Sequence, residues 1–349
     1  MDIISMLPDE LLCHILSFLP TKQAAATCVL SKRWKFLLTL VPALEYSDRF
    51  YLIHNKPYSC FERLVRTTIL ARDAKQLIRS FSLKYKSSDS DRSYRFFCNW
   101  VYPAIQRGIE NLDIEIRKYS CRIDFTIFSC RTLVVLKLAC LHVHFSSSVE
   151  LPSLKCLHLF EVVLRKPQCL WELFGGCPIL EDLKAISIKN EDGYFCVEGF
   201  KRLPKLVRAD IGGYYRDYIP LKAISNVEFL SIYKFRADDD VVPQFPNLLH
   251  LVLTFEAWMT MNWHLVLEML RNCPKLQVFE LTSRAGGHKD VLPHTHLVPV
   301  PECLTSSLRK CSLGLAYGTE NDLQFAKYIM QNSTTLRTMT ICNGNFTWF

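Results

Sequence analysis

Glycine is scarce in this chain, at 12 of its 349 residues. Enzymes that bind nucleotides cradle phosphates with glycine-rich loops, and the sequence contains no such loop. It also contains neither the G-x-S-x-G motif of hydrolases nor the H-E-x-x-H motif of zinc proteases. No uncharged apolar run reaches the roughly 18 residues that a membrane-spanning helix needs. These absences predict a binding protein that is neither an enzyme nor bound to a membrane.

The N-terminus and the cysteines predict the compartment. No secretory signal is visible, because the residues before Leu7 are not basic and Asp9 and Glu10 interrupt the apolar run. The 15 cysteines are odd in number, evenly spread and free of any C-x-x-C pair. Structural zinc sites and disulfide frameworks use tighter spacing. We therefore expect small buried side chains in the reducing cytoplasm or nucleus.

Histidine gathers in two places, at His142 and His144 and again at His288, His294 and His296. No cysteine pair near either group completes a zinc site, so we expect exposed loop histidines and neither metal nor cofactor. The net charge of +8 is modest, and Lys and Arg are scattered. A basic block that would indicate nucleic-acid binding is missing, so the charge is interpreted as favouring solubility.

The first forty or so residues hold three short apolar segments. The segment 7–20 predicts a helix, with Pro8 suited to its first position. Thr21 and Ser31 are candidate N-caps of two further helices, the last of which ends before Pro42. Each helix has one apolar face, and a unit this small rarely buries enough surface to be stable alone. The residues by themselves leave open whether these faces pack on the rest of the chain or dock onto another protein.

The same stretch, LPDELLCHILSFLPTKQAAATCVLSKRWKFL, resembles the F-box. It carries the L-P-[DE]-[DE]-[LIV]-L opening, the [IL]-L-x-x-L-P close and the L-S-[KR]-R-W motif. In that family the three-helix unit binds a Skp-type adaptor inside a cullin ubiquitin ligase. The motif positions imply these adaptor contacts: Leu7, Pro8, Leu11, Leu12, Ile15, Leu16, Leu19, Pro20, Val29, Leu30, Ser31 and Trp34. Trp34 could instead be a core tryptophan, since tryptophan serves both roles.

An apolar-x-x-apolar-x-apolar hexamer recurs eleven times, from IRSFSL (78–83) to LRTMTI (336–341). The intervals mostly lie in or near the 20–29 residues of leucine-rich repeats. Each hexamer predicts a short parallel strand with its apolar side chains inward, and the segment between hexamers returns over the back, often as a helix. The asparagine or cysteine expected shortly after each strand is absent, so we expect irregular repeats without an asparagine ladder.

The C-terminal region resembles the FBD region of plant F-box/leucine-rich-repeat proteins, through VPECLTSSL (300–308) and the helical pattern ENDLQFAKYIMQN (320–332). The resemblance implies an α/β chain with a three-helix F-box at residues 1–45, leucine-rich repeats at 46–295 and an FBD-like region at 296–349. The repeats would form a solenoid with strands on its concave side and helices on its convex side. We expect the FBD-like region to cap its open end.

Residues between the inward-facing positions of each strand would line the concave side. These candidate target contacts are Lys137, His158, Lys184, Arg208, Asp210, His250 and Glu280. The resemblance implies a substrate-recognition subunit of a cullin–Skp ubiquitin ligase, without catalytic residues, that binds a Skp-type adaptor and an unknown target protein. The alternative is a repeat scaffold with no ligase link, whose helices only cover the end of the repeats. A ligand sensor and a nucleic-acid-binding protein are weaker alternatives.

Overall fold

The computed structural model describes residues 3–73, 75–86, 97–117, 122–123, 125–143, 148–166, 168–191, 201–213, 219–234, 242–256, 263–283, 299–315 and 319–343. The chain divides into two compact units. The first comprises Met1–Ile179 with Ile188–Tyr194, and the second comprises Leu180–Ser187 with Phe195–Phe349. Each unit is described by itself. Among the described helices, none combines the length and the apolar character needed to span a membrane.

The N-terminal helices of the first unit lie close to where the sequence predicts them. They are η1 (Ile4–Met6), α1 (Asp9–Ser17), α2 (Thr21–Ala26), η2 (Thr27–Val29) and α3 (Lys32–Leu40). Pro8 precedes α1 as its N-cap residue instead of occupying the first helical position. Ser31 caps α3 as predicted, because its hydroxyl accepts the Trp34 N–H at 3.4 Å. The prediction for Thr21 was wrong: this residue begins α2, and its hydroxyl accepts the Glu45 N–H at 2.8 Å.

Five parallel strands follow in the first unit, each paired with the next along the chain. They are β1 (Ala43–Ser47), β2 (Ser80–Tyr85), β3 (Asn111–Ile116), β5 (Val135–Ala139) and β7 (Cys156–Phe160). The helical segments are α4 (Arg49–Ile53), α5 (Tyr58–Leu70), η3 (Phe97–Val101), α7 (Tyr102–Ile105), η4 (Phe125–Ser129) and α8 (Cys169–Gly175). A second, small parallel sheet contains β4 (Arg122–Ile123), β6 (His142–Val143), β8 (Val163–Leu164) and β10 (Lys189–Asn190).

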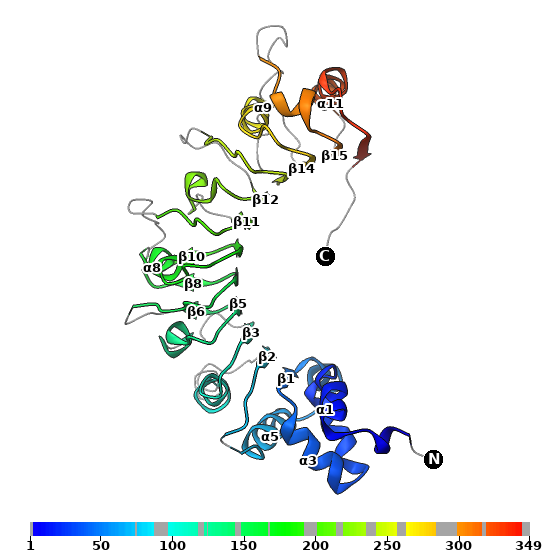
Figure 1. Ribbon diagram of the computed structural model, residues 1–349, viewed down its shortest axis with the longest axis vertical. Coiled ribbons are helices and arrows are strands. Elements are labelled where there is room, and N and C mark those ends of the chain that lie inside the picture. Colours follow the sequence, from blue (N-terminus) through cyan, green and yellow to red (C-terminus); the bar gives the residue numbers. More distant parts are fainter. Residues whose placement is uncertain are drawn as a thin grey trace. The chain divides into compact units, whose positions relative to one another are not determined.

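The second unit continues the same pattern, and Figure 1 shows its strands beside one another in chain order. The strands are β9 (Asp182–Ile186), β11 (Arg208–Gly212), β12 (Phe229–Tyr233), β13 (His250–Phe255), β14 (Val278–Ser283), β15 (Lys310–Leu315) and β16 (Thr338–Asn343), all parallel. Its helices are η5 (Leu221–Ile224), α9 (Trp263–Arg271), α10 (Glu302–Ser306) and α11 (Glu320–Asn332). Every hexamer predicted as a strand overlaps one of the parallel strands of the two units.

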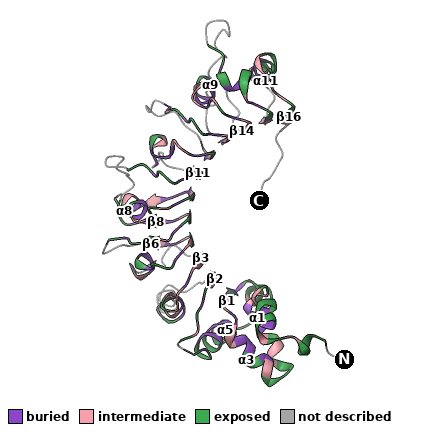
Figure 2. Cartoon of the chain, viewed as in Figure 1, coloured by how far each residue is buried: buried purple, intermediate pink, exposed green. Residues whose placement is uncertain are grey.

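Side chains alternate along each strand between the core and the other face. In β13, for example, Leu251, Leu253 and Phe255 are buried while the residues between them are partly exposed. This period of two puts a continuous apolar ladder on one face, which the return segments cover. Trp263 of α9 and Phe325 of α11 stack on each other, with ring centroids 4.0 Å apart. Figure 2 shows buried residues along the strands and on α9.

Two recurring backbone contacts join consecutive repeats. The carbonyl of the residue just before a strand accepts two N–H groups from the next repeat: Leu249 accepts from Gln277 and Val278 at 2.8 and 2.9 Å. Arg309 accepts in the same way from Arg337 and Thr338, at 2.8 and 3.1 Å. These paired bonds fix the spacing of the repeats, because every strand must begin at the same level as its predecessor.

A polar ladder is present, although not at the position where leucine-rich repeats usually carry asparagine. The residue three places before a strand donates to a carbonyl of the preceding repeat in several repeats. The donors are Thr132 (to Ile109, 2.7 Å), Asn226 (to Leu206, 2.9 Å), Ser307 (to Leu276, 2.9 Å) and Thr335 (to Leu308, 2.9 Å). Leu141 and Val162 occupy the positions after the strands, where asparagine was sought, and both are fully buried. Apolar packing therefore replaces the usual ladder there.

The C-terminal region extends the parallel strands of the second unit. It contributes α10, β15, α11 and β16, and a capping box of Thr319 and Asp322 begins α11. The sequence led us to expect a cap here. In the described residues, β16 instead leaves Ile341 50% exposed, whereas Leu313 at the matching position of β15 is 1% exposed. The region thus adds repeats to the stack and leaves apolar surface at its last described strand.

Candidate functional site

The three N-terminal helices have a hydrophobic core of their own. It contains Leu12, Leu16, Ala24, Trp34, Leu37, Leu38 and Val41, all buried. Leu7, Cys13 and Leu19 pack against it and remain partly exposed. An ion pair of Arg33 with Asp9, at 2.7 Å, joins α3 to the start of α1. The three helices therefore pack around a small core of their own.

The adaptor contacts implied by the F-box resemblance separate into two groups in the structure. Leu12, Leu16 and Trp34 lie in the core with at most 8% of their surface exposed, so their side chains cannot offer a docking surface. Leu7, Leu19 and Pro20 are partly exposed. The remaining residues are exposed: Pro8, Leu11, Ile15, Val29, Leu30 and Ser31.

Two exposed aromatic residues join this group, although the motif did not single them out. Phe18 is 74% exposed and Phe36 is 57% exposed. Phe18, the C-cap residue of α1, follows Leu11 and Ile15 at helical spacing. We define the N-terminal apolar surface as these six residues: Leu11, Ile15, Phe18, Val29, Leu30 and Phe36. A monomer normally buries such side chains, so an uncovered group of them indicates an interaction site.

Buried hydrogen bonds join the end of α3 and the strand β1 to residues of α5 and the segment after it. The buried guanidinium of Arg72 donates to the carbonyls of Leu38 and Val41, at 2.9 and 2.6 Å. The hydroxyl groups of Tyr46 and Thr68 lie 2.6 Å apart in the interior. Burial raises the pKa of Tyr46 to about 12. Exposed α1 residues such as Leu11 take no part in these contacts.

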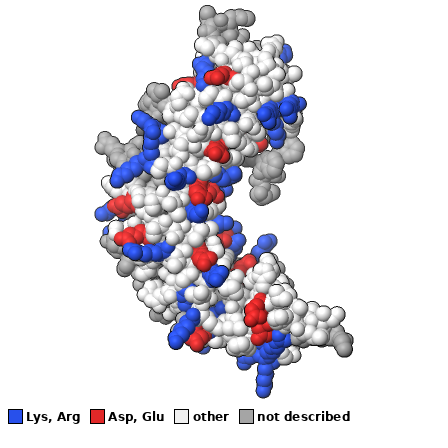
Figure 3. All heavy atoms as spheres, viewed as in Figure 1, with Lys and Arg blue, Asp and Glu red and all other residues white. Residues whose placement is uncertain are grey.

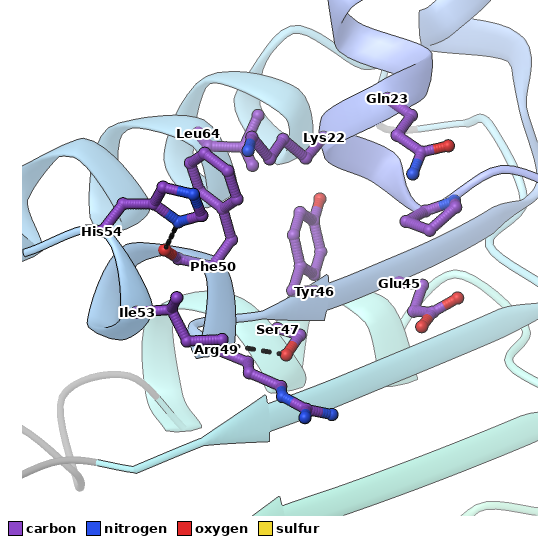
Figure 4. Close-up of a pocket in the computed structure, with 11 residues that line it drawn as sticks. Lys22, Gln23, Glu45, Tyr46, Ser47, Arg49, Phe50, Ile53, His54 and Leu64 are labelled. Carbon is purple, nitrogen blue, oxygen red and sulfur yellow. Dashed lines mark hydrogen bonds between the residues drawn. The ribbon is translucent and has the colours of Figure 1, made fainter. Parts of the chain in front are cut away.

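A pocket of about 330 Å³ lies between α2, β1 and α4 in the first unit. Figure 4 shows Phe50 and His54 side by side, with Lys22 and Tyr46 nearby. The rings of Phe50 and His54 stack with centroids 4.2 Å apart, and the ammonium of Lys22 lies over the Phe50 ring. Burial lowers the pKa of Lys22. With its one ammonium already on an aromatic ring and no nucleophile paired to a base, the pocket offers a binding hollow and no evident chemistry.

The strand-face residues predicted to contact a target lie between the buried positions of their strands, as expected. Lys137 and His158 belong to the first unit, where they are side by side on β5 and β7. Lys184, Arg208, Asp210, His250 and Glu280 belong to the second unit. None of the seven is fully buried. Their placement follows from the period of two along each strand.

In the second unit several of these residues touch one another. Lys184 Nζ lies 3.0 Å from Asp210 Oδ2, and His250 Nε2 lies 3.2 Å from Glu280 Oε1. The sequence did not single out Phe229, yet its ring contacts both the Arg208 guanidinium, at 3.6 Å, and the His250 ring, at 4.9 Å. Phe229 occupies the first position of β12, and the register aligns it with the first residues of β11 and β13.

The candidate target contacts of the second unit carry charges of both signs. Lys310 Nζ lies 3.8 Å from the same Glu280 oxygen that faces His250. Burial lowers the pKa of His250, and the adjacent Glu280 carboxylate partly opposes that shift. Figure 3 shows Lys and Arg interspersed with Asp and Glu over the described part of the face that it draws. Such a surface suits a protein partner better than the uniformly negative backbone of a nucleic acid.

Most of the histidines considered as metal ligands lie outside the described residues: His144, His288, His294 and His296. The remaining one, His142, has its Nδ1 3.5 Å from a Glu191 oxygen. Of the described cysteines, six are buried: Cys130, Cys169, Cys177, Cys273, Cys303 and Cys311. They occupy core positions of the repeats, in agreement with their interpretation as small buried side chains.

Comparison with known proteins finds matches to both ends of the chain and relatives that align with nearly its full length. The family model of the F-box domain matches residues 4–44, and the family model of the FBD domain matches residues 297–341. An FBD-associated F-box protein of Arabidopsis thaliana is 38% identical, over 97% of this chain and 90% of the relative. A second one is 31% identical, over 98% and 92%, and an F-box/FBD/LRR-repeat protein of the same plant is 30% identical, over 97% and 86%. With this identity over nearly its whole length, the chain belongs to the plant F-box/FBD/leucine-rich-repeat protein family.

Proposed function

We propose that the chain is the substrate-recognition subunit of a cullin–Skp-type ubiquitin ligase. In this proposal residues 1–45 act as the F-box that binds the Skp-type adaptor, and the adaptor connects the chain to a cullin. Residues 46–295 act as leucine-rich repeats that bind a target protein, and residues 296–349 act as the FBD region. The chain itself catalyses no covalent reaction, and it acts in the cytoplasm or nucleus. Holding adaptor and target together raises the local concentration of target lysines near the ubiquitin-charged enzyme.

The observation that supports adaptor binding is that the three helices have separate sets of core and exposed apolar residues. Leu12, Leu16 and Trp34 fill an internal core, so the unit does not need the N-terminal apolar surface for its own folding. Leu11 and Ile15 are 50% and 45% exposed, and no described part of the chain covers them. An α-helical apolar stripe that remains in water is typical of a surface that receives another protein's helices.

The test uses the full chain and a purified Skp-type adaptor. We expect the double variant Leu11→Glu with Ile15→Glu to lose adaptor binding at least a hundredfold, because each carboxylate would be desolvated at the interface. The matched control carries Leu70→Glu and Leu77→Glu, two exposed apolar residues outside the N-terminal helices. The control should bind normally. Unchanged binding by the first variant, with circular dichroism showing it folded, would reject the ligase role and favour the repeat scaffold without a ligase link.

For target binding we propose the strand-face residues Lys137, His158, Lys184, Arg208, Asp210, His250 and Glu280, together with Phe229 and Lys310. The Leu11→Glu, Ile15→Glu variant should keep its targets bound in cells, because without the adaptor it cannot deliver them to the ligase. Proteins captured by that variant should be lost when Arg208→Ala and Lys310→Ala are added. Lys201→Ala with Lys205→Ala, exposed residues before β11, serves as the control. Equal capture by the two double variants would exclude the strand face of the second unit as the binding site.

A further inference from the structure

The last strand of the second unit, β16, is an edge strand whose apolar side chains are more exposed than those of its neighbour β15. The core row Phe279–Cys311–Met339 is 0% exposed in β14 and β15 and becomes partly exposed in β16. The neighbouring row ends at Ile341, which is 50% exposed. Both rows therefore stop with apolar side chains in water, one strand short of being covered.

The main chain of β16 shows the same incompleteness. Thr338 donates its N–H to Arg309 of the preceding repeat, so the even-numbered residues of β16 direct their main-chain groups toward β15. Backbone direction alternates along a strand, so Met339 and Ile341 direct their N–H and C=O groups toward the free edge. No described strand pairs with that edge. Two donors and two acceptors are thus aligned for another strand.

The first edge of the sheet in the first unit, at β1, is covered by a helix. There, α2 covers β1: the Thr21 hydroxyl accepts the Glu45 N–H, and Leu44 and Tyr46 are at most 2% exposed. Proteins usually protect open edges in this way, or with charged residues, proline or bulges. The sequence of β16, TMTICN, contains no charge and no proline. In the described residues, this edge therefore lacks the charge, the proline and the helical cover that keep strands of two molecules from pairing.

We propose that β16 pairs in antiparallel fashion with β16 of a second copy of this chain. A twofold axis at Thr340 places Met339 opposite Ile341 of the second copy, so that the two half-exposed core residues continue the apolar face across the dimer. In this register Met339 and Ile341 are hydrogen-bonded pairs that exchange both N–H···O bonds, four in total about the axis. The strand is complementary to itself, and it carries no charge that two copies would bring together.

Helix α11 is consistent with such a neighbour but does not carry the pairing. Leu323 and Met330, 45% and 58% exposed, lie on the side of α11 opposite Phe325, the ring that packs toward α9. Lys327 lies between them on that side and is also exposed. Its ammonium would oppose close contact of two α11 helices. The strands therefore form the centre of the dimer, with the helices at its margin.

Sedimentation of the full chain alone, at concentrations up to about 100 μM, tests the proposal, since even a dimer with a Kd near ~10 μM would form there. We expect twice the 40.5 kDa mass of the chain. Ile341→Lys should weaken the dimer at least tenfold, because the ammonium would enter the paired apolar row. Val207→Lys, at a 44% exposed apolar residue away from this edge, should leave the dimer intact. A chain that stays monomeric throughout, or a dimer indifferent to Ile341→Lys, overturns the proposal.

Cross-linking tests the register itself. In the proposed dimer Thr340 faces Thr340 of the second copy as a non-hydrogen-bonded pair, with Cα atoms about 4.5 Å apart. In a Cys342→Ser background, Thr340→Cys should form an intermolecular disulfide on mild oxidation, because that spacing suits the bond. Thr338→Cys in the same background should not, since residue 338 faces residue 342. Cross-linking by Thr338→Cys and not by Thr340→Cys would overturn the register. Neither experiment involves the adaptor, so its outcome is independent of the proposed ligase role.

Discussion

The guanidinium of Arg72 donates to the carbonyl of Val41 at 2.6 Å, across the boundary between the N-terminal helices and the first repeat. The same group donates to Leu38 at 2.9 Å and to Thr68 at 3.2 Å. Leu38 lies in the last turn of α3, where helix carbonyls lack partners inside the helix. Arg72 thus satisfies the end of the helix and ties it to α5, which positions the N-terminal apolar surface on the first repeat.

Replacing this residue should therefore destabilise the first unit. Arg72→Met keeps much of the side-chain volume and leaves two interior carbonyls without donors, so we expect the free energy of unfolding to fall by about 2–4 kcal/mol. Urea denaturation measures the change. Arg66→Met, an exposed arginine on the same α5 helix, should change it by less than about 0.5 kcal/mol. Equal effects of the two substitutions would mean that the buried hydrogen bonds contribute little.

Neighbouring residues of α1 should separate stability from binding. Leu12 is fully buried, so Leu12→Ala should cost about 2–5 kcal/mol through lost contacts and the cavity left behind. Leu11 is half exposed, so Leu11→Ala should leave stability nearly unchanged while weakening adaptor binding. Denaturation and adaptor titration of the two variants give opposite orders if this is right. A Leu11→Ala variant that unfolds easily and binds normally would contradict it.

Gly212, at the end of β11, is expected to be irreplaceable. It has φ 145°, and a Cβ there would lie 2.0 Å from the carbonyl oxygen of Tyr233. Gly212→Ala should therefore cost more than about 2 kcal/mol, through steric overlap and an unfavourable backbone conformation. Gly175, at the end of α8, has nothing within 4 Å of the Cβ position, and Gly175→Ala should be neutral or slightly stabilising. Melting temperatures of both variants check the contrast.

Tyr46 should make stability fall in strongly alkaline solution. Burial raises its pKa to about 12, from an ordinary value of about 10 in the unfolded chain. Below pH ~10 the phenol is neutral in both states, and its contribution to stability is complete. Between pH ~10 and ~12 only the unfolded chain ionises, so stability declines by up to about 1.4 kcal/mol per pH unit. Tyr46→Phe should lack this portion of the decline when unfolding is compared from pH 9 to 11.5. Parallel curves for the two proteins would assign the pH dependence to other groups.

The spacing of apolar residues was sufficient to find most of the strands. The eleven hexamers all overlap parallel strands, because a period of two with long intervals has few other physical solutions. The strand β1 was missed, although Val41, Leu44 and Tyr46 have the spacing of the hexamer, because Val41 was assigned to the third predicted helix. The two-residue strands of the small sheet, such as β8, are too short for any periodic signal.

For the candidate site, the motif located the surface and could not sort its residues. Leu11 and Leu12 are adjacent and chemically identical, yet one is half exposed and the other is fully buried. The direction of each side chain depends on how α1 is rotated against α3, which is a matter of packing. Phe229 escaped notice for a similar reason, since its contacts with Arg208 and His250 come from two neighbouring strands.

The sequence by itself determined the family, the N-terminal helices and the order of the parallel strands, because these depend on local spacing and on motifs contiguous in the chain. Only the tertiary structure decided which apolar residues remain in water: Ile15 on α1, Phe36 on α3 and Ile341 on β16. Burial depends on what other segments cover, so neither the pattern of a helix nor the hexamer of a strand contains that information.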